Sequence, residues 1–166
     1  MATAQHTASD PRATHLRDGE GTDIWVAGSH HLFKIRGEGQ GYSLFESLTP
    51  PNEGPPPHIH RTQDEAFYVI SGEFTFYHGA DTIVAGPGSF VFIPRGTAHT
   101  FRTTGTLPGK ALTILTPPGP LERFFDEVGI PVEDRASFRP PPGPPDVDAF
   151  VASGRRQQIE FLLPPR

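Results

Sequence analysis

The chain contains no cysteine among its 166 residues, so no disulfide framework can hold the fold together. It also lacks any apolar run near the ~20 residues that a membrane helix needs. The polar N-terminal segment, residues 1–21, shows no apolar stretch of the kind found in signal peptides. These absences suit a reducing compartment. We therefore expect a cytoplasmic protein with no membrane partner.

An excess of basic residues is missing as well. Lysine and arginine number 14, against 19 aspartate and glutamate residues, which gives a formal net charge of -5. A chain with this balance has no basic face with which to bind a phosphate backbone or an anionic lipid surface. We therefore expect no nucleic acid partner.

Proline and glycine are abundant instead, with 20 and 18 residues. Proline removes a backbone donor and breaks helices, so its frequency in the middle of the chain argues against long helices. The length suits one domain with a real core and is short for two. Short apolar segments separated by turns predict eight or more antiparallel strands, and thus an all-β double-sheet jelly roll or barrel.

We expect the chain to consist of two parts. Residues 1–21 are polar and aperiodic, and we expect a flexible N-terminal arm that is mobile or crosses a neighbouring molecule. Residues 22–166 form a single domain, with a barrel core at about residues 24–117 and a helical cap plus edge strand at residues 118–166. Strands are expected at residues 22–30, 31–36, 42–49, 65–70, 73–77, 82–85, 89–93 and 110–116.

Three of these strands carry further expectations. Residues 42–49 alternate cleanly between apolar and polar side chains and predict a strand with two usable faces. Residues 89–93 are apolar on both faces, so this strand should be buried on both sides. Residues 110–116 should close the sheet as the last strand of the barrel.

The C-terminal part changes character. Residues 121–128 carry apolar side chains at helical spacing and predict a short amphipathic helix that caps the barrel. A second short helix is expected at residues 146–153, with Asp146 as its N-cap and Gly154 as its end. Residues 158–163 then supply an edge strand, either to the same barrel or to that of a partner.

Four side chains in the middle of the sequence have the spacing of metal ligands. His58 and His60 are two residues apart, so they share one face of a strand. Glu65 follows five residues later, and His99 belongs to a later strand, so the set assembles only when the sheet closes. Two or three histidines and one carboxylate commonly bind a divalent first-row metal and leave positions open for water, substrate or dioxygen. We predict one metal site whose occupancy is linked to folding.

The other histidines are assigned ordinary surface or core roles. An isolated histidine is more often a surface or core residue than a ligand. His30 and His31 are adjacent, so they point to opposite faces of a strand and have poor geometry for a single ion. The residues assigned these roles are His6, His15, His30, His31 and His78.

Aromatic side chains surround the predicted site. Phe67 and Val69 share the face of Glu65, so both should line the metal cavity. Phe101 and Thr103 share the face of His99, where Thr103 is a candidate hydrogen-bond donor behind the ligands. A partly dry aromatic pocket suits a planar or enolisable small-molecule substrate. The expected substrate-binding residues are Phe67, Val69, Phe74, Phe76, Phe101 and Thr103.

The two segments that carry the predicted ligands resemble the signature motifs of the cupin superfamily. Residues 58–72 follow the pattern HxHx4Ex6G, and residues 88–99 follow the pattern Gx5PxGxxH. Asn52 and Thr103 stand where the family usually has Gly and Asn, and neither is a ligand. Further phrases from residue 24 to residue 165 are similar to single-domain cupins related to quercetin 2,3-dioxygenase.

This resemblance implies a metal-dependent dioxygenase with a double-stranded β-helix fold. In such relatives a flavonol oxygen binds the metal, the glutamate acts as general base and dioxygen cleaves the heterocycle, so Glu65 is the implied catalytic residue. The ligand set suits one divalent Fe, Mn, Ni, Co, Cu or Zn ion. Related cupins often dimerise through sheet edges, and we expect a homodimer.

Two other classes of function stay open at this point. One is a non-oxidative isomerase, cyclase or lyase of secondary metabolism, in which the metal only polarises a carbonyl and dioxygen takes no part. The other is a small-molecule-binding cupin without turnover, because one scaffold serves many functions. Retention of all four predicted ligands counts against the second alternative.

Overall fold

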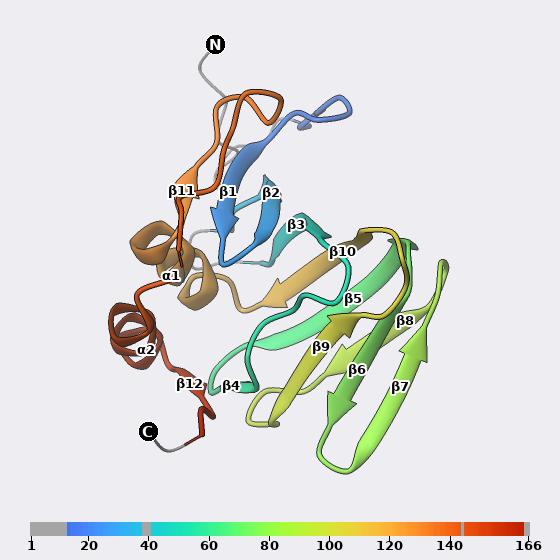
Figure 1. Ribbon diagram of the computed structural model, residues 1–166, viewed down its shortest axis with the longest axis vertical. Coiled ribbons are helices and arrows are strands. Elements are labelled where there is room, and N and C mark those ends of the chain that lie inside the picture. Colours follow the sequence, from blue (N-terminus) through green and yellow to red (C-terminus); the bar gives the residue numbers. More distant parts are fainter. Residues whose placement is uncertain (1–12, 38–40, 144, 165–166) are drawn as a thin grey trace.

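The computed structural model describes residues 13–37, 41–143 and 145–164. These residues form two antiparallel sheets, which face each other as a jelly-roll barrel, and two short helices on one side of the barrel (Figure 1). The predicted fold is therefore confirmed. Most of the predicted arm, residues 1–12, lies outside the described residues, as does His6. Among the described residues, no helix has both the length and the apolar character to cross a membrane.

The larger sheet has seven strands in the order β11-β1-β2-β3-β10-β5-β8. The predicted last strand of the barrel, β10, lies in the middle of this sheet and pairs with both β3 and β5. The strands of this sheet are β1 (Thr22–Val26), β2 (Ser29–Ile35), β3 (Ser43–Thr49), β5 (Asp64–Ser71), β8 (Phe90–Ile93), β10 (Gly109–Thr116) and β11 (Ile130–Pro131).

The smaller sheet has five strands in the order β12-β4-β9-β6-β7. The predicted C-terminal edge strand is β12, and it pairs with β4 of its own barrel. The strands of this sheet are β4 (His58–His60), β6 (Phe74–His78), β7 (Asp81–Ala85), β9 (His99–Thr103) and β12 (Ile159–Phe161).

The first turn lies earlier than the sequence predicts. The turn falls at Ala27 and Gly28, which have φ values of 45° and 100°. Glycine tolerates this left-handed backbone conformation, so Gly28 marks the reversal. His30 and His31 consequently both belong to β2, and the predicted strand boundary between them is wrong.

Strand β8 corrects a second expectation. Phe90 and Phe92 are 63% and 54% exposed, whereas Val91 and Ile93 are buried. The strand lies at the edge of the larger sheet, and nothing within the described chain covers its outer face. The prediction that it is buried on both sides is therefore wrong.

Helices α1 (Pro120–Val128) and α2 (Val147–Arg156) confirm the two predicted helices with one change of boundary. Asp146 is the N-cap of α2, because its side chain accepts a hydrogen bond from the Ala149 amide at 3.0 Å. Gly154 does not end this helix. It is buried against Phe161, and a Cβ at this position would lie 2.5 Å from that ring, so glycine is needed for the close approach.

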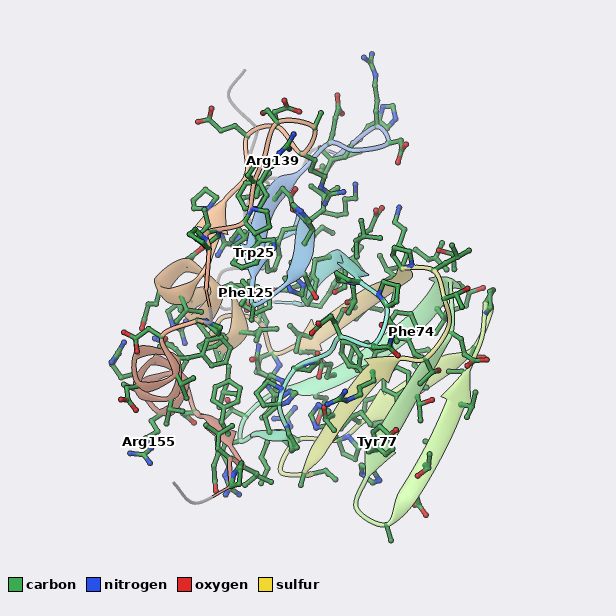
Figure 2. All side chains as sticks on the ribbon, viewed as in Figure 1. Trp25, Phe74, Tyr77, Phe125, Arg139 and Arg155 are labelled. Atoms are coloured by element: carbon green, nitrogen blue, oxygen red, sulfur yellow. The ribbon has the colours of Figure 1, made fainter. Side chains whose placement is uncertain are left out.

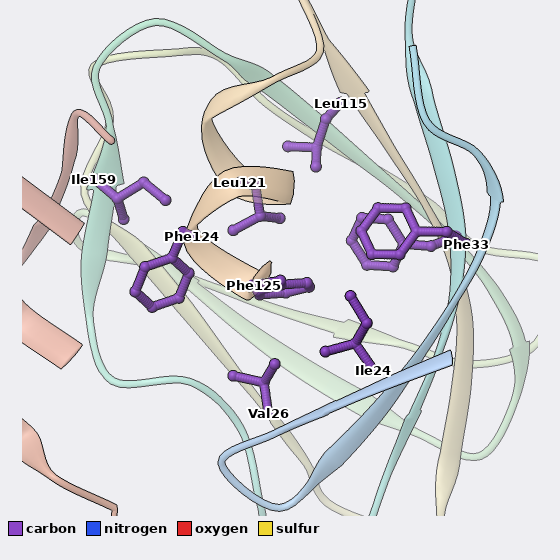
Figure 3. Packing of buried hydrophobic residues seen from close by; sticks show 9 residues of the cluster. Ile24, Val26, Phe33, Leu115, Leu121, Phe124, Phe125 and Ile159 are labelled. Carbon is purple, nitrogen blue, oxygen red and sulfur yellow. The ribbon is translucent and has the colours of Figure 1, made fainter. Parts of the chain in front are cut away.

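The barrel interior contains two hydrophobic clusters on opposite sides, with Phe125 in one and Phe74 in the other (Figure 2). The helix-side cluster packs α1 against β1, β2, β3, β10 and β12 (Figure 3) and consists of Ile24, Val26, Phe33, Phe45, Leu115, Leu121, Phe124, Phe125 and Ile159. The strand-side cluster consists of Phe67, Val69, Phe74, Phe76, Ala85, Val91, Ile93, Phe101 and Ala111.

Candidate metal centre

Both sheets contribute to the predicted metal site. His58 and His60 are buried on one face of β4, and His58 lies directly opposite His99 on β9. Glu65 lies on β5 of the other sheet. Alternation along β4 therefore aims two imidazoles inward, and closure of the two sheets brings the carboxylate to them.

The four side chains converge on one point. Their candidate ligand atoms all lie within 4.8 Å of one another, and all four residues are buried. The Nε2 atoms of His58 and His60 are 3.2 Å apart. The Glu65 Oε2 atom lies 3.0 Å from Nε2 of His99 and 3.5 Å from Nε2 of His60. A group of three imidazoles and one carboxylate at these separations could hold a divalent metal ion.

Backbone carbonyls behind two of the three imidazoles fix their orientation. His58 Nδ1 donates to the Pro56 carbonyl at 2.9 Å, and His99 Nδ1 donates to the Thr97 carbonyl at 3.0 Å. A carbonyl only accepts, so the proton of each neutral ring sits on Nδ1 and the lone pair of Nε2 faces the centre. This is the arrangement that metal-binding histidines usually have. The chemistry of the donors therefore fits the ion that the motif implies.

The electrostatics of the group also favour a cation. Burial, reinforced by the neighbouring His60 and His99, lowers the pKa of His58 to about 3, so its ring is neutral near pH 7. Burial alone would raise the pKa of Glu65, but the charges and hydrogen bonds of the surrounding imidazoles lower it to about 2. For His99, burial is outweighed by the Glu65 carboxylate, and its pKa is raised. The Glu65 carboxylate is therefore ionised, and a metal cation bound among the imidazoles would neutralise its charge.

A cavity of about 90 Å³ adjoins these ligands and is lined by members of both hydrophobic clusters. Its aromatic wall includes Phe45, Phe67 and Phe101 from the strands. On the helix side, Phe124 and Phe125 of α1 and Phe150 of α2 close it. The site is thus an aromatic chamber whose wall includes three of the four candidate ligands, His58, His60 and Glu65.

The structure separates the predicted substrate-binding residues into two groups. Phe67 and Phe101 line the cavity. Val69, Phe74 and Phe76 are buried in the strand-side cluster and are not part of the cavity wall. Thr103 is fully buried, and its hydroxyl donates to the Pro50 carbonyl rather than to a ligand. Alternation along a strand indicates the inward face but does not indicate the depth along the barrel axis.

Several residues that line the cavity were not predicted from the sequence, and some of them are polar. His31, Ser47 and Thr113 are among these polar residues and line the cavity from the larger sheet. His31 was assigned an ordinary role because His30 beside it points the other way. Ser47 had a detectable signal, since strict alternation in β3 gives its inner face the residues Ser43, Phe45, Ser47 and Thr49.

Comparison with known proteins agrees with this architecture. The cupin domain family matches residues 45–115, a segment that contains all four candidate ligands. This match supports membership of the cupin superfamily. Among relatives of known activity, the quercetin 2,3-dioxygenase of Bacillus subtilis is 28% identical over 121 residues, which are 71% of this chain. The chain spans only 35% of the length of that relative.

Solved structures resemble the chain in fold. KdgF from a Halomonas species superposes with a TM-score of 0.58 at 14% identity, and the match covers 66% of this chain and 99% of that one. A RmlC-like cupin from Shewanella frigidimarina gives a TM-score of 0.52 at 19% identity, covering 63% and 92%. The cupin domain of Cnp3 from Schizosaccharomyces pombe gives 0.52 at 13% identity, covering 60% and 71%.

Proposed function

We propose that this protein is a metal-dependent dioxygenase that cleaves a flavonol-like or other enolisable aromatic substrate. The observation that carries the proposal is the buried convergence of His58, His60, Glu65 and His99 beside an aromatic cavity. The similarity to a quercetin 2,3-dioxygenase supports the choice of reaction. Three imidazoles and one carboxylate would hold the ion, and such a ligand set would leave room for substrate or dioxygen to bind to it.

The residues of the chain have distinct tasks in this reaction. The three imidazoles hold the ion, and an ion in this position would supply Lewis acidity and dioxygen chemistry. Glu65 either completes the ligand set or takes the proton from the substrate hydroxyl with its carboxylate, which is ionised because its pKa is about 2. Phe67 and Phe101 hold the planar ring and exclude water.

The size of the cavity supports small substrates over large ones. Its volume of about 90 Å³ is well below the roughly 300–1,000 Å³ of typical ligand sites. A full flavonol requires outward movement of the helices or of the β1–β2 turn, whereas a single enolisable ring requires less. The same observation favours the second candidate, a non-oxidative isomerase, cyclase or lyase that acts on a small carbonyl compound.

One experiment separates these candidates. The protein is purified without added metal, its metal content is measured by elemental analysis, and dioxygen consumption is followed with quercetin and with single-ring enolisable phenols. Stoichiometric metal with dioxygen uptake is the expected result. Metal with conversion of a substrate but no uptake would establish the non-oxidative reaction, and binding without any conversion would reduce the protein to a binding module.

Replacing Glu65 tests its role as a base. Glu65→Gln keeps the shape of the side chain and removes its basicity, so we expect most of the metal to remain and turnover to fall about 10²–10⁴-fold. Metal content and steady-state rate are measured on the same preparation. A variant that loses its metal completely would show that Glu65 is needed as a ligand.

The expected homodimer stays a prediction. The exposed faces of β5 and β8 carry Tyr68, Phe90 and Phe92, which form an apolar surface at a sheet edge. Exposed edges and apolar patches are common contact sites between protein chains. Sedimentation analysis at micromolar concentration tests whether two chains associate. The cytoplasmic location likewise stays a prediction.

A further inference from the structure

Four polar side chains cross the inner face of the larger sheet in an oblique line. Thr113 lies on β10, two residues from the position opposite Glu65, and Ser47 lies on β3, two residues from the position opposite Thr113. Ser47 is directly opposite His31 on β2. Diagonal neighbours in a sheet are about 7–8 Å apart. The line, which we name the polar diagonal, leads from the metal centre to the far wall of the cavity.

All members of the polar diagonal line the cavity, and one of them is unsatisfied. Thr113 is 1% exposed, and its Oγ1 atom is buried without a hydrogen-bond partner among the described residues. Burying a hydroxyl without a partner costs free energy, and valine would fill the same volume without that cost. A ligand oxygen in the cavity would supply the missing partner.

His31 is held in place at the other end of the diagonal. Its Nδ1 atom lies 3.2 Å from the Ser47 hydroxyl, and its ring packs 4.5 Å from that of Phe125 and 5.6 Å from that of Phe45, measured between centroids. Burial lowers its pKa to about 3, so the ring is neutral and offers one donor and one acceptor.

We infer that Thr113, Ser47 and His31 form a second binding subsite, which takes a distal hydroxyl or carbonyl of the substrate whose enol oxygen binds at the metal. The inference rests on the proposed function, because it requires an open metal position on the opposite wall. It defines the substrate class as a small planar compound with two oxygen functions, one at the metal-binding end and one beyond the ring. A purely apolar ring would leave the Thr113 hydroxyl unpaired.

A matched pair of probes tests this assignment. Kojic acid and allomaltol share the hydroxypyranone group that chelates metals, and kojic acid alone carries an additional hydroxyl, on its exocyclic carbon. Both are titrated into protein loaded with Co²⁺. The visible spectrum of the cobalt reports binding at the metal, and calorimetry gives the affinity. We expect the wild-type protein to bind kojic acid about five- to tenfold more tightly, the effect of one added hydrogen bond.

Variants then locate the hydrogen bond. Thr113→Val and Ser47→Ala should each reduce the preference for kojic acid and leave the affinity for allomaltol nearly unchanged. The matched control is Thr75→Val, which alters a buried threonine on β6 that bonds to Thr104 and does not line the cavity. We expect this control to keep the wild-type preference for kojic acid. That result would show that losing a buried hydroxyl elsewhere in the barrel does not reduce the preference.

The possible failures can be distinguished. Equal affinities of the wild-type protein for both probes, with a perturbed cobalt spectrum, would overturn the polar subsite and leave the metal site intact. An unchanged preference in both Thr113→Val and Ser47→Ala would do the same. A loaded protein whose cobalt spectrum responds to neither probe would overturn the open metal position, and the inference would fall with it.

Discussion

The two sides of the barrel interior are built from similar aromatic residues but differ in what lies among them. The strand-side cluster is a continuous apolar core around Phe74 and Phe76, which are 1% and 0% exposed. The helix-side cluster borders a chamber that also contains imidazoles, hydroxyls and a carboxylate. Strands alone enclose the strand-side cluster, whereas helices α1 and α2 help to close the side that borders the candidate metal centre.

The largest expected effect tests the apolar side. Phe76→Ala removes a fully buried ring that packs 4.9 Å from Phe67 between centroids. We expect the free energy of unfolding to fall by about 3–5 kcal/mol, measured by denaturant titration. The metal content of the folded fraction should stay unchanged. A loss below about 1 kcal/mol would contradict the division between the two sides.

Removal of a ligand tests the other side. His58→Ala should abolish stoichiometric metal binding, as should His60→Ala and His99→Ala. A metal at 100 times its dissociation constant stabilises the folded state by about 2.7 kcal/mol. Chelation should therefore lower the melting temperature of the wild-type protein and leave that of each variant unchanged. Three variants that all keep full metal would show that the site is assigned wrongly.

Acid should weaken the helix side through His31. Its pKa is about 3 in the folded state, against an ordinary value of 6.5, so below pH 6.5 the unfolded chain binds a proton that the folded chain does not. This contribution is constant above pH 6.5 and declines as the pH falls toward 3. Between pH 6.5 and pH 5 the metal-free protein should lose about 1 kcal/mol to this residue, less than full linkage because the ring is partly accessible.

The matching measurement is the pH dependence of unfolding in His31→Phe, which cannot take up a proton. Its stability curve between pH 6.5 and pH 5 should be flatter than that of the metal-free wild-type protein. Parallel curves for the two proteins would show that His31 is not buried in its neutral form.

The smallest expected effect concerns the outer face. Phe90→Ser replaces a side chain that is 63% exposed, so the stability of the isolated chain should change by no more than about 0.5 kcal/mol. If chains pair through this surface, the sedimentation coefficient should fall toward that of a monomer. A loss of stability similar to that of Phe76→Ala, without a change in association, would show that the face is covered.

The sequence was sufficient for the parts of the molecule that depend on local periodicity. Alternation along β4 places His58 and His60 on one face, and the jelly roll follows from short strands and frequent turns. The sequence was insufficient for features that depend on how deep a residue lies in the barrel or on which strands lie beside it. Phe90 and Phe92 look like core residues because the sequence does not show that β8 is an edge strand.

The same limit explains the errors around the site. Phe74 and Phe67 both point inward, but only Phe67 reaches the cavity, because their distances from the metal centre differ along the barrel. His31 could not be separated from His30 before the strand that carries both was placed. Gly154 resembles a helix end, and only the approach of Phe161 explains it as a packing residue.

The pairing of β4 has a consequence for biosynthesis. This strand of three residues carries two of the candidate ligands, and its neighbours are β9, some 40 residues later, and β12, about 100 residues later. A chain emerging from the ribosome therefore holds His58 and His60 on an incomplete sheet until residues 159–161 have been made. Completion of the sheet around two of the candidate ligands is therefore linked to the pairing of a strand about 100 residues later.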